Sequence, residues 1–195
     1  QPTLDYTGMR RADIAIEAVV ESMEIKRRVL RDLEAVTPEG FVFATNTSSL
    51  PIGQIAEGAQ RPRDVVGMHF FNPVHKMPLV EVIPGETTSP EVTAAAWTFQ
   101  EMMGKTPIHS ADASGFIVNR YFVPWLNEAV RLLEEGTADI PTIEAAAKKS
   151  FGAGMGPFEL MNVTGIPIAM HAANTLGSAF GPFYAPTELL KKQVA

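Results

Sequence analysis

Cysteine is absent from the 195-residue sequence, which excludes disulfide bonds, thiolate nucleophiles and cysteine-ligated metals. No apolar run approaches the roughly 18 residues that predict a membrane-spanning helix, and no charged-then-apolar leader opens the sequence. Basic residues are in the minority, with 16 Lys and Arg against 22 Asp and Glu and a net charge of -6, so nucleic acid is not expected as a partner. A reducing compartment fits the lack of cysteine, and we expect a cytoplasmic protein without a membrane span.

The remaining composition is that of an ordinary globular protein, with 46% hydrophobic and 19% charged residues. A chain of this length can bury roughly 70% of its unfolded surface, enough for one large domain or two small ones. Its one basic cluster, residues 26–31, lies in a helical pattern and is interpreted as mostly solvated helix face.

The first 110 residues alternate short apolar runs with helical periodicity, which is typical of βα units around a largely parallel sheet. We expect strands at 14–16, 41–44, 65–70, 79–83 and 106–110, and helices at 21–36, 51–58 and 89–104. Ser89 before Pro90 predicts the start of the third helix, and its inward residues are expected to be Val92, Ala95, Ala96, Phe99 and Met103.

Beyond Asp112 the pattern becomes helical throughout. Helices are expected at 115–135, 141–150 and 157–179, with a glycine-rich segment before the third, and Pro124 should kink the first. We place a domain boundary near Asp112, which divides the chain into an α/β domain at 1–112 and an all-α domain at 113–195.

Glu81 lies between Val80 and Val82 in a strand whose apolar pattern predicts burial. Burying a carboxylate costs free energy unless the group is paired. His69, at the end of the preceding strand, is its candidate partner. A carboxylate against an imidazole fixes the tautomer and raises the basicity of the ring, as a general base requires. On spacing alone a simpler interpretation is favoured, in which Glu81 faces solvent from an edge strand and His69 is a core histidine with satisfied hydrogen bonds.

Two further polar groups lie where ligands could bind. Residues 46–49 (NTSS) directly follow a strand, at the carboxyl edge where open α/β sheets bind ligands. They could equally be an ordinary N-cap for the helix at 51–58. Asn119, beside Arg120, opens the first helix beyond the domain boundary, where a polar group can face an interdomain cleft. Without other evidence, Asn119 and Arg120 could equally be ordinary surface residues.

The other usual chemistries have little support. His75, His109 and His171 lack the spacing of metal ligands, with each other or with acids, so no metal site is expected. No G-x-S-x-G nucleophile elbow is present.

Six motifs, in order and spacing, resemble the 3-hydroxyacyl-CoA dehydrogenase family. They are 16–21 (IEAVVE), 46–50 (NTSSL), 67–74 (GMHFFNPV), 79–83 (LVEVI), 115–120 (GFIVNR) and 155–160 (MGPFEL). The resemblance covers essentially the whole chain. Residues 2–6 (PTLDY) and 73–78 (PVHKMP) look more like the dehydrogenase region of the bacterial multifunctional fatty-acid oxidation protein, its alpha subunit, than like single-function enzymes.

The resemblance implies NAD-dependent oxidation of (S)-3-hydroxyacyl-CoA to 3-oxoacyl-CoA in fatty-acid β-oxidation. It makes His69 the general base and Glu81 its partner, which overrides the simpler reading of that pair. Ser48 would bond the reacting oxygen and contact the cofactor, and Asn119 would reach the substrate. The implied cofactor-binding residues are Val19, Val20, Glu21, Lys26, Ser48 and Asn72, with no metal.

The chain departs from the family pattern in its phosphate-binding motif. The G-x-G-x-x-G turn is absent from the sequence and would lie before Gln1. We therefore expect residues 1–112 to form the C-terminal part of a Rossmann-like NAD-binding domain, and the isolated chain to be inactive. Ser114, Gly154 and Asn162 replace two prolines and an aspartate common in the family.

The resemblance also predicts partners. The helical domain resembles the family's dimerisation region, so we expect a homodimer or a place in a β-oxidation complex. Two alternatives stay open at this point: the chain is a helical interaction module of a larger multifunctional protein, or it is a dehydrogenase for another 3-hydroxy acid.

Overall fold

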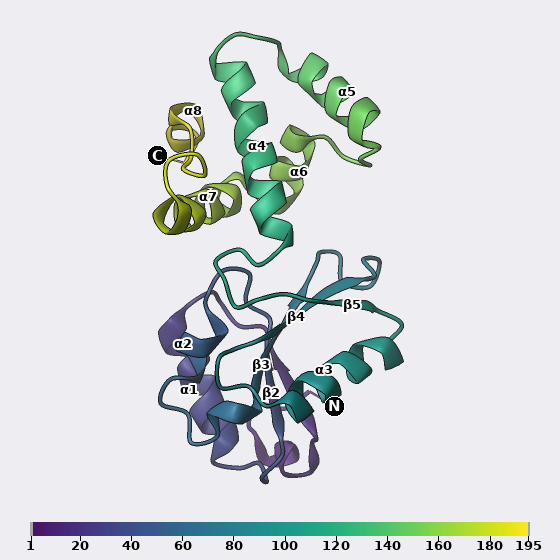
Figure 1. The fold of residues 1–195 in the computed structure, drawn as a ribbon, viewed down its shortest axis with the longest axis vertical. Helices are drawn as coiled ribbons and strands as arrows, with labels where there is room; N and C mark the ends of the chain where they lie inside the picture. The colour runs from purple at the N-terminus through teal and green to yellow at the C-terminus, as the bar shows by residue number, and fades with distance from the viewer. Residues whose placement is uncertain (1, 195) are drawn as a thin grey trace. The chain divides into compact units, whose positions relative to one another are not determined.

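The computed structural model describes residues 2–194. They form two compact units, of which the first ends at Phe116 and the second begins at Ile117; Figure 1 shows a sheet with helices in one and helices only in the other. The first unit contains β1 (Ile14–Glu17), β2 (Val42–Thr45), β3 (Val65–Phe70), β4 (Leu79–Pro84) and β5 (Thr106–His109), the helices α1 (Met23–Glu34), α2 (Ile52–Ala56) and α3 (Pro90–Met102), and the 3-10 turns η1 (Thr7–Arg11) and η2 (Pro62–Asp64).

The five strands form one sheet in the order β1-β2-β3-β4-β5. Three of the four neighbouring pairs are parallel, and β3 pairs with β4 in antiparallel fashion. The reversal has a simple cause, because residues 71–78 contain no helix and are too few for a crossover of a dozen or more residues. The expectation of a largely parallel α/β sheet is thus confirmed, with one antiparallel junction.

The sheet is buried on both faces, which explains why its strands read as continuous apolar runs. Phe43 and Val65 pack with α1 and α2 in one hydrophobic cluster. Their strand neighbours Ala44 and Val66 pack with α3 in a second cluster on the opposite face. Ser89 caps α3 as expected, since its Oγ accepts a hydrogen bond from the amide of Val92.

The inward face of α3 differs from the expected one. Val92, Ala96 and Gln100 are buried, whereas Ala95 is exposed and Met103, 45% exposed, lies just past the helix. Residues four apart lie on one helix face, so the buried stripe continues into Gln100 in spite of its polarity. Its Nε2 donates to the sulfur of Met68 at 2.9 Å.

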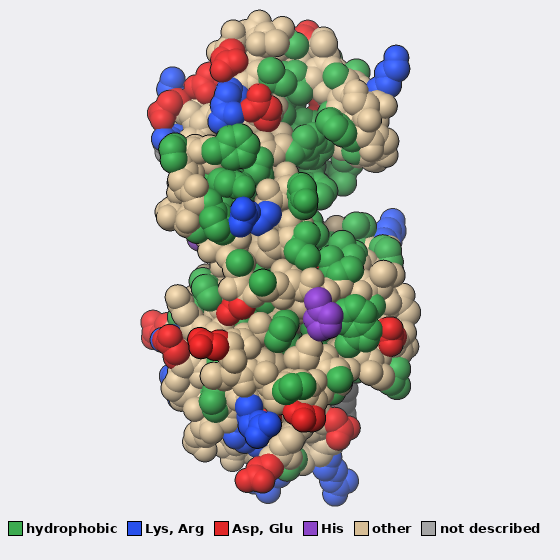
Figure 2. Space-filling model, viewed as in Figure 1, with side chains coloured by type: hydrophobic (Ala, Val, Ile, Leu, Met, Phe, Trp, Pro, Cys, Tyr) green, Lys and Arg blue, Asp and Glu red, His purple; other side chains and the backbone are tan. Residues whose placement is uncertain are grey.

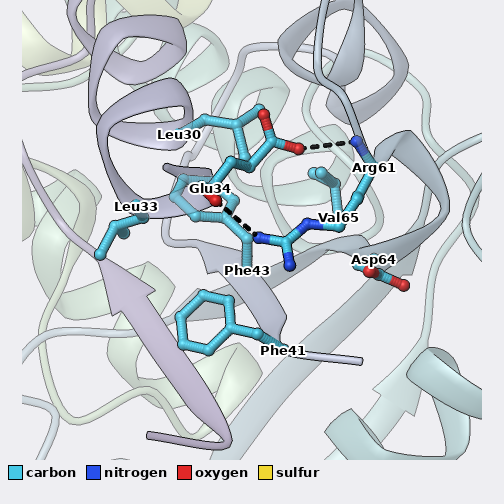
Figure 3. A pocket seen from close by; sticks show the side chains of 8 residues that line it. All are labelled: Leu30, Leu33, Glu34, Phe41, Phe43, Arg61, Asp64 and Val65. Atoms are coloured by element: carbon cyan, nitrogen blue, oxygen red, sulfur yellow. Dashed lines mark hydrogen bonds between the residues drawn. The ribbon is translucent and has the colours of Figure 1, made fainter. Parts of the chain in front are cut away.

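A small pocket at the amino ends of β2 and β3 is structural in character (Figure 3). The carboxylate of Glu34, at the end of α1, accepts hydrogen bonds from the amides of Gln60 and Arg61 at 3.1 and 2.7 Å. The guanidinium of Arg61 returns to the carbonyl oxygen of Glu34 at 3.3 Å. These contacts close a loop onto α1 at the edge opposite to the carboxyl ends of the strands.

The second unit is all-helical. It contains α4 (Val118–Glu134), α5 (Ile140–Phe151), α6 (Pro157–Thr164), α7 (Ile166–Phe180) and α8 (Glu188–Lys192). The single helix expected at 157–179 is wrong: it is two helices, because Gly165 adopts a φ of 103° between them. Helix α8, capped by Thr187, was not expected. Pro124 lies inside α4, and the kink stays a prediction.

Gly156 allows a cap that joins two helices of this unit. The carboxylate of Glu144, on α5, accepts a hydrogen bond from the amide of Phe158 in the first turn of α6 at 2.7 Å. A Cβ added at Gly156 would overlap that carboxylate, whereas one at Gly154 would meet nothing within 4 Å.

We therefore expect Gly156→Ala to destabilise the helical unit by about 1 kcal/mol, the usual cost of a lost cap. Unfolding is followed by the fluorescence of Trp125 in a Trp97→Phe background. Gly154→Ala is the matched control and should cost less. In a Glu144→Ala background, where the cap is already gone, Gly156→Ala should have no further effect; an undiminished cost there would contradict this explanation.

None of the helices in residues 2–194 is long and apolar enough to cross a bilayer. Over the same residues, no group of three or more His, Asp or Glu side chains is arranged to hold a metal ion.

Candidate active site

The carboxyl ends of β1, β2 and β3 lie at one edge of the sheet because these three strands are parallel. In open α/β sheets this is the edge at which ligands bind. Asn46 extends the pairing of β2 and β3 beyond the last strand residue, since its Oδ1 accepts a hydrogen bond from the amide of Phe70 at 3.0 Å. The polar segment 46–49 is thereby tied to the end of β3, which carries His69.

His69 and Glu81 stand directly opposite each other in the antiparallel β3–β4 pair. The Nδ1 atom of His69 lies 2.7 Å from Oε2 of Glu81, and both residues are buried, with 6% and 0% of their surface exposed. Strand β4 is internal to the sheet, so the reading of Glu81 as an edge-strand residue facing solvent is wrong. An ionised carboxylate only accepts hydrogen bonds, which places the proton of neutral His69 on Nδ1 and leaves the lone pair on Nε2.

Two aromatic rings flank the imidazole. The ring centroid of Phe71 lies 4.5 Å from that of His69 and the centroid of Phe116 lies 5.7 Å from it. Phe116 is buried and adopts a φ of 49°, an uncommon conformation for a bulky residue. The carboxylate-bound histidine is therefore in contact with two apolar rings, where water competes less for its hydrogen bonds.

A buried ion pair lies at the ends of β1 and β2. The ammonium of Lys26, on α1, is 2.9 Å from Oε1 and 3.2 Å from Oε2 of Glu17, and both side chains are completely buried. The same carboxylate accepts hydrogen bonds from Thr45 Oγ1 at 2.7 Å and from the amide of Val19 at 2.6 Å. Glu17 is thus fully satisfied, as a buried charge must be.

Lys26 also reaches a second carboxylate, that of Glu21, at 3.4 Å. Oε1 of Glu21 accepts hydrogen bonds from Thr47 Oγ1 at 2.6 Å, from the amides of Ser48 and Ser49 at 3.0 and 3.1 Å, and from Ser49 Oγ at 3.1 Å. The Glu21 side chain therefore holds residues 47–49 in place. We call these residues the serine segment.

These bonds also set the charge of Glu21. Burial by itself raises the pKa of Glu21, but the Thr47 hydroxyl, the Lys26 charge, the Ser48 amide and the Ser49 hydroxyl together hold this pKa below the usual 4.5. At neutral pH the Glu21 carboxylate is therefore ionised.

The lowered pKa of Glu21 predicts a pH dependence of stability. A carboxyl group with a lower pKa in the folded state stabilises that state above its unfolded pKa and loses this contribution as pH falls through the folded value. Glu21→Gln should therefore be less stable than wild type at neutral pH, and the difference should shrink below pH 4.5. Urea unfolding across pH measures this, with the exposed Glu39→Gln as control; a difference that stays constant with pH would contradict it.

Four of the other expected site residues are exposed near the carboxyl edge of the sheet. Val19 and Val20 follow β1 and are 39% and 65% exposed. Ser48 is exposed, and Asn72 is exposed in the turn after β3, where its peptide bond to Pro73 is cis. Asn119 is the second residue of α4, in the helical unit. Lys26, the remaining expected cofactor residue, is completely buried.

Sequence reasoning did not single out Glu17, Thr45 and Phe116. Glu17 carried the same signal as Glu81, a carboxylate in an apolar strand, and Lys26 in the next helix was its available cation. Thr45 and Phe116 gave no comparable signal. A threonine at the end of a strand and a phenylalanine in a turn are both ordinary core residues.

Comparison of the chain with known proteins identifies a family. Residues 1–113 match the NAD-binding domain of 3-hydroxyacyl-CoA dehydrogenases, and residues 115–195 match the C-terminal domain of the same enzymes. The two matches meet where the compact units meet, within a few residues.

Solved structures agree. The chain is 34% identical to Mycobacterium tuberculosis FadB2 (TM-score 0.95) and 34% identical to the (S)-3-hydroxybutyryl-CoA dehydrogenase PaaH1 of Ralstonia eutropha (TM-score 0.94), covering 98% of its own length and 68% of each of theirs. It is 35% identical to the 3-hydroxybutyryl-CoA dehydrogenase of Escherichia coli (TM-score 0.93), covering 99% of its own length and 41% of that chain. The chain therefore belongs to the 3-hydroxyacyl-CoA dehydrogenase family of oxidoreductases, with NAD as the cofactor of its first domain.

Proposed function

We propose that the protein oxidises (S)-3-hydroxyacyl-CoA to 3-oxoacyl-CoA with NAD in cytoplasmic fatty-acid β-oxidation, and that His69 and Glu81 form its general base. The observation that carries the proposal is the buried pair across β3 and β4, with His69 Nδ1 at 2.7 Å from Glu81 Oε2. It lies at the ligand-binding edge of the sheet, in a chain whose relatives include 3-hydroxybutyryl-CoA dehydrogenases.

We infer a task for each group in the reaction. Nε2 of His69 takes the proton of the substrate hydroxyl as the C3–H bond breaks and the C3–O double bond forms. Glu81 stabilises the imidazolium that results, and it keeps the ring in the tautomer that can accept the proton. NAD, when bound, accepts the hydride from C3.

Ser48 and Asn119 are proposed to act on the substrate. The exposed hydroxyl of Ser48 would donate to the reacting oxygen, and it is held in place by the bonds that its segment makes to Glu21. Asn119 would supply an amide from the helical domain. A hydrogen bond to the reacting oxygen contributes most where the donor is fixed before the reaction starts.

The residues at the carboxyl edge fit the nicotinamide side of NAD. Val19 and Val20 offer exposed apolar surface beside the carboxylate of Glu21, and Asn72 adds an amide. Because Lys26 is completely buried between Glu17 and Glu21, we propose that it acts through Glu21 and does not touch the cofactor.

The glycine-rich turn that holds the pyrophosphate of NAD is not among the 195 residues. We therefore expect this chain alone to bind NAD weakly and to show no turnover. The comparison that checks this joins the chain to an N-terminal strand and glycine-rich turn of the G-x-G-x-x-G type; activity gained only in the joined protein supports the expectation, and equal activity in both contradicts it.

The test of the proposed function is NADH formation by the joined protein, which carries the glycine-rich turn. The expected result is turnover with (S)-3-hydroxybutyryl-CoA and none with the R enantiomer. Free 3-hydroxybutyrate is the matched control for the CoA moiety. Turnover of the free acid at an equal rate would instead favour a dehydrogenase for other 3-hydroxy acids, and no turnover of any of these would contradict the proposal.

A second candidate role is association through the helical unit, as a homodimer or within a multifunctional complex. Figure 2 shows hydrophobic side chains gathered on the surface of this unit. Its most exposed large apolar side chains, between 62% and 76% exposed, are Tyr121, Phe151, Val163, Ile168 and Phe183. Soluble monomers rarely expose large contiguous apolar patches. Sedimentation velocity tests this role, and a strict monomer at all concentrations would contradict it.

A further inference from the structure

The segment that leaves β5 is pinned to α2 by one carboxylate. Oδ1 of Asp112 accepts a hydrogen bond from the amide of Ile52, and Oδ2 accepts one from the amide of Gly53, both at 2.7 Å. These amides belong to the first turn of α2, where the N-cap residue Pro51 supplies no side-chain bond. Asp112 therefore provides the missing cap from about 60 positions along the chain.

Two glycines leave room for the close packing around the Asp112 carboxylate. A Cβ added to Gly53 would lie 3.3 Å from Oδ2 of Asp112, and one added to Gly85 would lie 3.1 Å from the amide nitrogen of Gly53. The turn after β4, the start of α2 and the segment after β5 thus pack closely at one point. Both carboxylate oxygens are occupied by backbone amides, so Asp112 is built to hold the backbone.

The two segments joined by Asp112 both lead to the active site. On one side, α2 follows directly on the serine segment, whose Thr47 hydroxyl accepts a hydrogen bond from the Leu50 amide at 2.9 Å. On the other side, four residues after Asp112, Phe116 is one of the two aromatic rings in contact with His69. Ile52 and Phe116 pack in the same hydrophobic cluster.

We propose that Asp112 is a positioning residue of the dehydrogenase site, which fixes the serine segment and the Phe116 ring in one arrangement relative to His69. The inference rests on the proposed function. It predicts that loss of either hydrogen bond lets both segments shift. A shift of about 1 Å in groups that orient the substrate can lower the rate by about 100-fold.

The first test does not depend on activity. Amide hydrogen exchange of the whole protein is compared between wild type and Asp112→Asn, in which the amide group can accept only one of the two bonds and turns a donor toward the other. Faster exchange at Ser48, Ser49 and Phe116, with α5 unchanged, supports the proposal. Unchanged protection at these three residues overturns it.

The second test measures, in the joined protein, kcat with (S)-3-hydroxybutyryl-CoA and the Kd of NAD. Asp112→Asn should lower kcat by roughly 10- to 100-fold and change the Kd of NAD by little. The matched control is Asp139→Ala, which removes a cap on α5, where Asp139 Oδ1 accepts from the Thr142 amide at 3.0 Å; its stability should fall while kcat stays unchanged. Equal kcat in wild type and Asp112→Asn overturns the proposal.

Gly53→Ala keeps the test decisive if Asp112→Asn folds poorly. Alanine favours the helix over glycine, yet its Cβ presses on Oδ2 of Asp112, so a well-folded variant with kcat lowered several-fold is expected. Unchanged kcat in a folded Gly53→Ala overturns the proposal. A joined wild-type protein without dehydrogenase activity would overturn the proposed function itself, whereas an active wild type whose kcat equals that of the variants overturns only the role of Asp112.

Discussion

Replacing His69 with glutamine should lower kcat for (S)-3-hydroxybutyryl-CoA by about 10²- to 10⁴-fold, the usual contribution of a general base. Glutamine can still bond Glu81 but has no group that takes a proton near neutral pH. The Kd of NAD should change little, because the loss lies in proton transfer. The measurement is NADH formation under saturating substrate, together with NAD binding followed by fluorescence.

His109→Gln is the matched control for this loss. His109 ends β5 in the same unit, is exposed and stacks on Trp97, so its replacement should leave kcat unchanged. A His69→Gln variant that retains wild-type kcat would show that another group removes the proton. The pairing with Glu81 would then be a structural feature only.

The largest expected effect on stability follows from Lys26. Its side chain and that of Glu17 are completely buried at 2.9 Å, and removal of one partner leaves an uncompensated buried charge, which costs about 3–5 kcal/mol. Lys26→Met keeps most of the volume and removes the charge. Unfolding by urea, followed by the fluorescence of Trp97 in a Trp125→Phe background, should therefore show a loss of that size.

Two comparisons separate the lost charge from other causes. Lys148→Met removes a lysine whose pair with Glu159 lies at the surface, with 42% of the lysine side chain exposed, and should cost far less. Adding Glu17→Gln to Lys26→Met should restore part of the stability, because the buried group left behind is then neutral. An equal loss in Lys26→Met and Lys148→Met would refute the explanation.

The sequence predicted most of the elements because their signals are local. Strand β3 has the expected limits, and the Ser89–Pro90 pair marks the start of α3. The break between α6 and α7 escaped prediction because it depends on the backbone conformation of a single residue. Gly165 breaks a continuous apolar helical pattern with a positive φ, and a glycine inside such a pattern is usually tolerated.

The clearest site prediction was a residue that is charged within an apolar strand. The sequence did not predict those site residues whose role depends on contacts with residues far away in the sequence. Glu81 was conspicuous because it is charged in an apolar strand, and the short connection to β3 pointed to His69. The buried state of Lys26 was hidden, because its neighbours Arg27 and Arg28 gave the cluster the character of a solvated face. Asp112 marked only a boundary, since its two amide partners lie about 60 positions earlier.

A double-mutant cycle on His69 and Glu81 tests directly whether the two residues form one general base. The rate of hydride transfer is measured in single turnovers of the joined protein with NAD and (S)-3-hydroxybutyryl-CoA, for wild type, His69→Gln, Glu81→Gln and the double variant. If the two residues act as one general base, Glu81→Gln slows the step by roughly 10-fold or more when His69 is present and has no further effect when it is absent. Equal slowing by Glu81→Gln in both backgrounds would contradict the account.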